Sequence, residues 1–147
     1  MTQVAKSSKR LKATGEWFLT GSAVVKESVV GKKRILVARS TYDFKGDLEG
    51  KWVGNNQRIE VDLDTGDAKG EELEATFTGT VFGKRGSFGM KDRWAVIDGN
   101  IPNSPFRIVK GTGKGELANV QGWGYYWGSA KDEKGKYVAW ISFQPKH

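Results

Sequence analysis

The feature that most constrains the fold is a long alternation of apolar and polar side chains between Leu36 and Trp52. Successive side chains of a strand point to opposite faces, so a period of two indicates a strand with one dry and one wet face. The stretch is too long for an ordinary strand. Gly46 and Gly50 on its dry side permit a sharp bend or the close approach of another group. A long, bent, one-sided strand is typical of a sheet that closes into a barrel. The dry positions are Leu36, Ala38, Ser40, Tyr42, Phe44, Gly46, Leu48, Gly50 and Trp52.

The composition favours an all-β protein. The 147 residues include 20 Gly but 3 Pro, together with 6 Trp, 4 Tyr and 7 Phe. Such a chain, without long helical patterns, is typical of strands joined by many turns. Its length suits one domain with a buried core. We therefore expect residues 1–12 to form a flexible basic tail and residues 13–147 to form a single β-barrel domain.

Alternating segments and glycine-rich turns predict the strands in order. The apolar positions change from even to odd numbers at Gly54-Asn55-Asn56, which indicates a bulge or a turn. Consecutive hairpins predict an antiparallel sheet. The expected strands are Ala13–Thr20, Ala23–Val30, Arg34–Val53 (one long strand or a bent pair), Leu73–Val81, Phe88–Val96, Phe106–Val109, Val120–Trp127 and Tyr137–Phe143, with a loop over Asp98–Pro105.

Four short motifs follow one another along the chain. They are Thr14-Gly15, then Phe44–Gly50, then Phe77–Val81 with Gly83 and Gly86-Ser87-Phe88, then Gly111–Leu117 with Gly122 and Gly124. In this order they resemble the motifs of a family of small bacterial proteins of undefined function, over roughly Thr14 to Phe143. The resemblance implies the allene-oxide-cyclase-like fold, a single small antiparallel β-barrel of about eight strands. Relatives of that barrel include dirigent proteins and cofactor-free cyclases, which steer reactive organic intermediates in an apolar cavity. A shared fold does not by itself carry the chemistry.

The formal net charge of the chain is +7. Basic residues gather beside glycines at 32–34, 84–85 and 131–136, so they are expected at loop tips, where a basic rim attracts anions. Single-stranded nucleic acid is nevertheless disfavoured, because the best alternations place the aromatic residues on the dry face. We expect a hydrophobic small-molecule ligand, with no membrane partner. A homodimer, with an exposed Trp140 at its interface, stays open.

The chain has no Cys, and residues 1–12 show no apolar signal-peptide core. A cytoplasmic location is therefore expected. The single histidine is His147, at the end of the sequence. A His-based catalytic triad or metal site is therefore not expected, and neither a metal nor a cofactor is predicted.

Asp92 is the strongest catalytic candidate. It shares the register of Phe88, Met90 and Trp94, which places a carboxyl group on an apolar face. Burial would raise its pKa and suit it to general acid or base work. The resembled family tends to carry a histidine here, so Asp92 keeps the position polar. The structural alternative is an aspartate paired with a tyrosine or with Arg39.

Aromatic side chains are expected to line an apolar pocket around Asp92. Trp123, Tyr125 and Trp127 share one face of their strand, and Tyr126 faces the other side. Tyr42 and Tyr125 are predicted to polarise a ligand beside Asp92. The glycines at 46, 50 and 79 are expected to leave room for that ligand. The predicted ligand-binding residues are Trp17, Phe44, Trp52, Phe77, Phe88, Met90, Trp94, Trp123, Trp127 and Tyr137.

Three functions remain open at this point. The first is a cofactor-independent cyclase or isomerase for a hydrophobic unsaturated small molecule, with Asp92 and a tyrosine as acid–base groups. The second is a non-catalytic carrier of the same ligands, in which Asp92 is paired and inert. The third is an anion or single-stranded nucleic-acid binder that uses the basic rim. The sequence does not separate the first two.

Overall fold

The computed structural model describes residues 9–144, and this part of the chain is built from strands alone. It contains no helix with the length and hydropathy needed to cross a bilayer. Of the expected basic tail, residues 1–8 lie outside the described residues, and the first strand begins at Leu11. The strands are β1 (Leu11–Val30), β2 (Lys33–Gly46), β3 (Leu48–Asp62), β4 (Ala68–Val81), β5 (Lys84–Val96), β6 (Asn100–Ile108), β7 (Lys114–Gly115), β8 (Val120–Ser129) and β9 (Lys134–Phe143).

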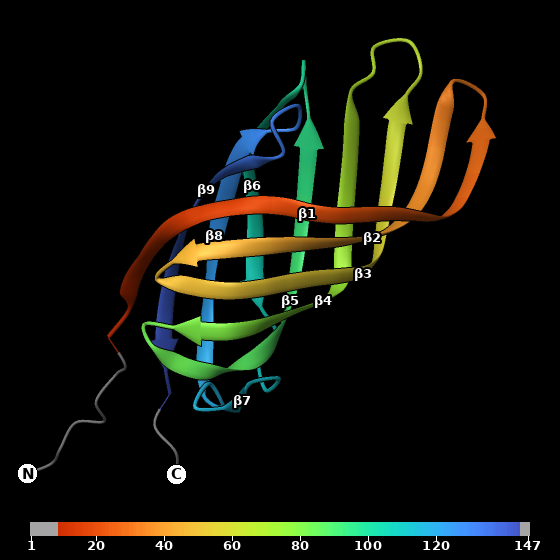
Figure 1. Ribbon diagram of the computed structural model, residues 1–147. Coiled ribbons are helices and arrows are strands. Elements are labelled where there is room, and N and C mark those ends of the chain that lie inside the picture. The colour runs from red at the N-terminus through yellow and green to blue at the C-terminus, as the bar shows by residue number, and fades with distance from the viewer. Residues whose placement is uncertain (1–8, 145–147) are drawn as a thin grey trace, which may run out of the picture.

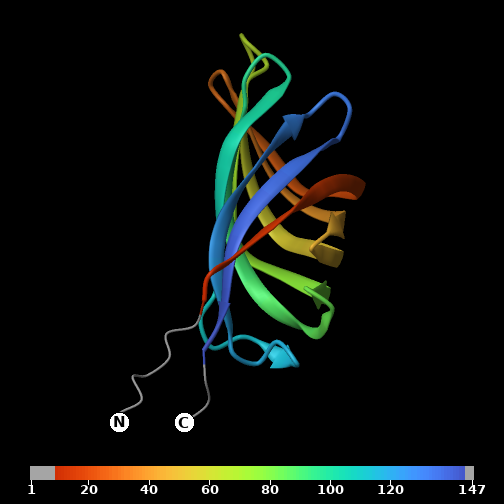
Figure 2. The ribbon, with the colours of Figure 1, turned by 90° about the vertical axis from the view of Figure 1, so that its left-hand side faces the viewer.

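The strands form one antiparallel barrel (Figures 1 and 2). Strands β1 to β5 pair in chain order, then β5 pairs with β6, β6 with β8 and β8 with β9. Pairing of β9 with β1 closes the eight-stranded ring, and the short β7 is an extra strand beside β5. The predicted all-β barrel of about eight strands is therefore confirmed.

The alternation between Leu36 and Trp52 is a bent pair of strands. It turns at Asp47, between the end of β2 and the start of β3. The Tyr137 hydroxyl holds this corner, because it accepts a hydrogen bond from the Leu48 N–H (2.9 Å) and donates one to the Lys45 carbonyl (2.9 Å). Most of the dry positions are buried, as expected, including Phe44 and Trp52.

The separate strands expected at Ala13–Thr20 and Ala23–Val30 are wrong, because β1 is continuous. Gly21 and Ser22 stay in the ladder opposite Thr41 and Ser40, and register shifts on either side bend the strand without ending it. The loop expected over Asp98–Pro105 is also wrong. Strand β6 begins at Asn100; a register shift between Ile101 and Ser104 accommodates Pro102, and Pro105 lies in the ladder opposite Tyr125.

The change of the apolar positions from even to odd numbers after Gly54 marks a bulge, which is one of the two alternatives, a bulge or a turn, expected from the sequence. Ala38 lies opposite Gln57 and Ser40 opposite Gly54, so β3 carries one extra residue. A second bulge follows in β4, where Glu72 pairs with Asp92 but Ala75 pairs with Met90. This second bulge turns Leu73 outward, with 54% of its side chain exposed, and turns Glu72 inward. Leu73 therefore does not share the buried face of Ala75 and Phe77, although its position in the alternating sequence favours that face.

The glycines at 50 and 79 bring strands together and do not enlarge the cavity. Gly50 pairs with Gly79, and Gly79 pairs in turn with Gly86. A Cβ atom on Gly79 would lie 2.1 Å from the Glu49 carbonyl oxygen, so only glycine permits this approach. Gly46 is likewise in contact with backbone, at the Thr14 carbonyl. The space expected at these glycines is occupied by neighbouring strands.

Candidate functional site

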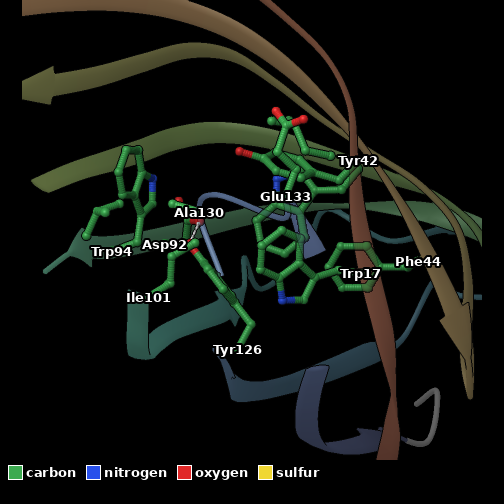
Figure 3. A pocket seen from close by; sticks show the side chains of 12 residues that line it. Trp17, Tyr42, Phe44, Asp92, Trp94, Ile101, Tyr126, Ala130 and Glu133 are labelled. Atoms are coloured by element: carbon green, nitrogen blue, oxygen red, sulfur yellow. Dashed lines mark hydrogen bonds between the residues drawn. The ribbon is translucent and has the colours of Figure 1, made fainter. Parts of the chain in front are cut away.

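A cavity of about 160 Å³ lies inside the barrel between β1, β2, β3, β5 and β8. Aromatic rings form most of its wall, and Figure 3 shows Trp94 on the side opposite Trp17 and Tyr42, with its indole nitrogen turned toward the other labelled side chains. An apolar cavity of about 150 Å³ holds one benzene ring, so this space suits a ligand of about one six-membered ring. The lining residues are Trp17, Leu19, Tyr42, Phe44, Trp52, Asp92, Trp94, Val96, Ile101, Tyr126, Ala130 and Glu133.

Asp92 points into this cavity from β5. Its residue is 7% exposed, so the burial expected from its register is confirmed. The Tyr126 hydroxyl donates a hydrogen bond to Oδ2 at 2.5 Å, drawn as a dashed line in Figure 3. Its other carboxyl oxygen, Oδ1, is buried and has no hydrogen-bond partner among the described residues. A carboxyl group with one engaged and one unengaged oxygen can exchange a proton with a bound molecule.

The surroundings of Asp92 raise its pKa from 3.8 to about 7. The main cause is burial, which penalises the charged carboxylate. The negative charge of Glu72 acts in the same direction, whereas the hydrogen bond from Tyr126 favours the charged form and opposes the rise. With a pKa near neutrality, both protonation states of Asp92 are populated under ordinary conditions, as a general acid or base requires.

Glu72 is a second buried carboxyl group that the sequence analysis did not single out. It is 0% exposed and lies across the β4–β5 ladder from Asp92. The two bulges hold it in place, because the N–H groups of Asn56 (3.2 Å) and Glu74 (3.2 Å) donate hydrogen bonds to its carboxylate. Burial raises the pKa of Glu72, and these hydrogen bonds oppose the rise. The only sequence signal for this role was the bulge after Gly54, because a bulge leaves backbone N–H groups that a side-chain acceptor can satisfy.

Two tryptophan residues that line the cavity have an indole N–H group without a hydrogen-bond partner among the described residues. The buried Nε1 atoms of Trp52 and Trp94 have no acceptor among the described residues. The Nε1 of Trp17, in contrast, donates to the Trp127 carbonyl at 3.1 Å. Burying an N–H group without an acceptor costs free energy. Three residues that line the cavity thus each hold one buried polar atom without a partner among the described residues, namely Oδ1 of Asp92 and Nε1 of Trp52 and of Trp94.

The tyrosine beside Asp92 is Tyr126, and the expectation that Tyr125 fills this role by facing inward is wrong. Tyr125 is 37% exposed on the outer face, together with Trp123 (41%) and Trp127 (36%), so their expected inward positions are wrong as well. The inner face of β8 is occupied by glycines beside Tyr126, and a Cβ atom on Gly124 would lie 2.2 Å from the Val138 carbonyl oxygen. The aromatic alternation thus marked the outer face of β8.

The other predicted site residues divide into two groups. Trp17, Tyr42, Phe44, Trp52 and Trp94 line the cavity with Asp92. Phe77, Phe88, Met90 and Tyr137 are buried in the core away from the cavity wall. The sequence analysis missed the lining residues Leu19, Val96, Ile101, Tyr126, Ala130 and Glu133.

Tyr42 belongs to the same polar group. Its hydroxyl accepts a hydrogen bond from Gln57 Nε2 at 3.3 Å. Burial, together with the charges of Asp92 and Glu72, raises its pKa. Burial and the contact with Asp92 also raise the pKa of Tyr126, so both tyrosines stay neutral. Within residues 9–144 no three His, Cys, Asp or Glu side chains gather closely enough to hold a metal ion.

Comparison with known proteins gives a family match and a similar fold. Residues 18–140 match the model of the family described as protein of unknown function (DUF3224). A crystal structure of a DUF3224 protein of unknown function from Shewanella oneidensis MR-1 is similar to this chain, with a TM-score of 0.74 and 20% sequence identity. The similarity covers 93% of this chain and 100% of the other. No curated protein matches the chain.

Proposed function

The chain belongs to the DUF3224 family of proteins of unknown function, and we propose that its barrel binds a small unsaturated carbonyl compound and isomerises it through Asp92. One observation carries the proposal. Asp92, whose carboxyl group is buried and has a pKa of about 7, lines the cavity together with Trp52 and Trp94, and each of the three residues has one buried polar atom without a hydrogen-bond partner among the described residues. Strongly perturbed titratable groups in apolar cavities are characteristic of catalytic sites.

The proposed reaction is a proton transfer between two carbon atoms. The charged form of Asp92 removes a proton from a saturated carbon at the α or γ position of the unsaturated carbonyl compound, the C–H electron pair enters the π system, and the negative charge moves onto the carbonyl oxygen to give an enolate. An indole N–H of Trp52 or Trp94 donates to the enolate oxygen and stabilises its charge. Neutral Asp92 then returns the proton to a different carbon. The substrate is neither oxidised nor reduced, so the step needs no further reactant.

The same chemistry extends to a cyclase. A cavity of about one ring in size holds an unsaturated chain in a folded conformation, which brings its reacting atoms together. The resemblance to the allene-oxide-cyclase-like barrel agrees with this class of reaction, and the fold similarity concerns the barrel alone. We therefore propose a cofactor-independent isomerase or cyclase as the finer assignment.

A non-catalytic carrier is the second candidate. The hydrogen bond of 2.5 Å from Tyr126 engages one oxygen of Asp92 and favours its charged form, as expected for a fixed structural pair. In a carrier, Asp92 would orient the polar end of a ligand without exchanging a proton with it. The lining residues would be the same, so the two functions differ in turnover and not in binding.

Cyclohexenone is a suitable probe, because it combines one six-membered ring with a conjugated carbonyl group. We expect it to shift the NMR signals of the Trp52 and Trp94 indole protons, whereas cyclohexene, the matched ring without a carbonyl, shifts them less. In heavy water the wild-type protein should accelerate hydrogen exchange at the saturated carbons α and γ to the carbonyl group of cyclohexenone. Asp92→Asn should lower that acceleration about a hundredfold or more and leave binding intact.

Each outcome selects one answer. Binding of cyclohexenone with no accelerated exchange in the wild-type protein would select the carrier. Equal exchange rates in wild type and Asp92→Asn would remove Asp92 from the mechanism. The absence of any shift of the indole signals with either compound would overturn the proposed ligand class. Native mass spectrometry of the purified protein then identifies the compound that it carries.

A further inference from the structure

The outer wall of the barrel carries a surface unlike its interior. We call it the aromatic–basic face, and it runs over β5, β6, β8, β9 and the first part of β1, most of which lie side by side in Figure 2. It consists of the outward residues Lys12, Lys91, Arg93, Arg107, Trp123, Tyr125, Trp127, Lys136 and Trp140. None of these residues takes part in the cavity described above.

Strand pairing sets these side chains in a row across the face. Lys91 lies opposite Arg107, Arg107 opposite Trp123, Trp123 opposite Trp140, and Trp140 opposite Lys12. The Trp123 and Trp140 rings pack on each other with centroids 4.7 Å apart. Two cations thus flank a pair of aromatic rings on one side, and a third cation flanks it on the other.

Part of this face is hollowed into a groove of about 410 Å³. Lys91, Arg93 and Arg107 line it together with the half-exposed rings of Trp123 and Tyr125. Glu71 and Asp92 are the acidic residues that line the groove; Glu71 lies opposite Arg93 in the β4–β5 ladder, and Asp92 is buried. The groove therefore presents an excess of positive charge beside flat rings that are open to solvent.

The cations of the groove differ from those at the β1–β2 turn. Lys32, Lys33 and Arg34 form ion pairs with Asp64 (3.4 Å), Glu60 (4.0 Å) and Glu27 (2.6 Å), so part of the basic rim is neutralised. Within residues 9–144, the cations of the aromatic–basic face form no ion pair. Their charges remain available to an external anion.

We propose that the aromatic–basic face binds single-stranded nucleic acid, with bases stacked on Trp123 and Tyr125 and phosphates on Lys91, Arg93 and Arg107. Base–aromatic stacking beside a positively charged groove is how proteins bind single strands without sequence preference. Side chains two residues apart on a strand are spaced by about 6.7 Å, and Trp123, Tyr125 and Trp127 follow one another at this spacing along β8. The rings of Trp123 and Tyr125 pack edge to face with their planes at 89°, so each ring would stack with a separate base. A second copy of the chain would bring cations against cations, so it fits this face poorly.

This inference reverses the expectation drawn from the sequence. Nucleic acid was disfavoured because the aromatic residues of β8 were assigned to the dry face. The structure exposes Trp123, Tyr125 and Trp127 next to the basic residues of β5 and β6. The argument against a nucleic-acid partner therefore no longer applies.

The test is fluorescence anisotropy with a labelled thymidine oligonucleotide of about 12 units. Tyr125→Leu keeps apolar bulk but removes the flat ring, and it should weaken binding about tenfold. Lys91→Ala and Arg107→Ala should each reduce the slope of log affinity against log salt by about 0.7. Arg39→Ala is the matched control, because it removes one exposed charge from β2, which is not part of the aromatic–basic face, and it should leave both quantities unchanged.

Three results would overturn the proposal. The first is no binding of the oligonucleotide at low salt. The second is binding that Tyr125→Leu leaves unchanged, which would indicate general attraction of polyanions; a sulfated polysaccharide that binds equally well would indicate the same. The third is binding of thymidine monophosphate as tight as that of the oligonucleotide. Tyr125→Leu should have the same thermal unfolding curve as the wild type, so that a loss of binding cannot come from a loss of folding.

Discussion

Asp92 is a single residue whose charged form the fold penalises, because its carboxyl group is buried. Its register on β5 places it in the dry interior, where the Tyr126 hydroxyl is its hydrogen-bond donor and Glu72 is a like-charged neighbour. Tyr42, on β2, adds a second hydroxyl to this group, and Glu133 lines the cavity from the β8–β9 loop. A site of this kind costs stability whenever Asp92 is charged.

We expect this cost to appear as pH dependence. Because the pKa of Asp92 is raised in the folded state, its favourable contribution is complete below about pH 4 and is lost as the pH rises through about 7. At about 1.36 kcal/mol for each pKa unit, wild type should lose on the order of 4 kcal/mol relative to Asp92→Asn between pH 4 and 8. Urea unfolding of both proteins at several pH values measures this difference. A difference that does not vary with pH would contradict it.

At the scale of elements, bulges and glycines shape the strands. The bulges in β3 and β4 turn Gln57 and Glu72 inward. The glycine pairs let β3, β4 and β5 approach at the bend below the cavity. Glu116 accepts a hydrogen bond from the Arg85 N–H at 3.0 Å and so ties the corner after β7 to β5. The position of the cavity therefore depends on backbone irregularities as much as on side-chain packing.

Gly79→Ala should be strongly destabilising. The new Cβ atom would lie 2.1 Å from the Glu49 carbonyl oxygen and 2.7 Å from the Gly50 Cα atom, so the backbone of β3 must move. We expect a loss of about 1–3 kcal/mol in the free energy of unfolding, measured by urea denaturation. Gly21→Ala is the control, since its Cβ atom would meet only the Thr41 hydroxyl, at 3.0 Å. Equal stabilities of the two variants would refute this account of the close approach.

For the whole molecule, pairing of the first strand with the last closes the barrel. The second half of β1, Gly21–Val30, which we call the β1 arm, has no strand on its outer side among the described residues. Strand β9 pairs with β1 over Leu11–Phe18, and the rest of β1 extends beyond it with β2 (Figure 1). Every residue from Gly21 to Val30 is exposed. Valines there are exposed by 53% to 67%, and the outer backbone edge of this segment is not paired with another described strand. Unpaired strand edges of this kind favour association with another strand.

The homodimer expected from the sequence stays a prediction, and we expect it at this arm. Trp140 is packed against Trp123 and is half-buried, so it is a weaker interface candidate. An antiparallel pairing of two β1 edges centred on Lys26 and Glu27 would set these opposite charges across from each other. Sedimentation equilibrium should show self-association that Val24→Lys with Val29→Lys abolishes. A wild-type protein that is monomeric at all concentrations would exclude it.

The sequence by itself determined the fold class, the alternation between Leu36 and Trp52 and the inward register of Asp92, whereas the structure decided between one long strand and a bent pair. These follow from local rules, because a period of two requires one buried face and a break in the period requires a bulge or a turn. The sequence could not decide which face of β8 is buried. Its alternation groups Trp123, Tyr125 and Trp127, but only closure against β6 and β9 leaves the glycine face inside. The partner of Asp92, the burial of Glu72 and the aromatic–basic face all depend on strands distant in the chain, so the tertiary structure alone decided them.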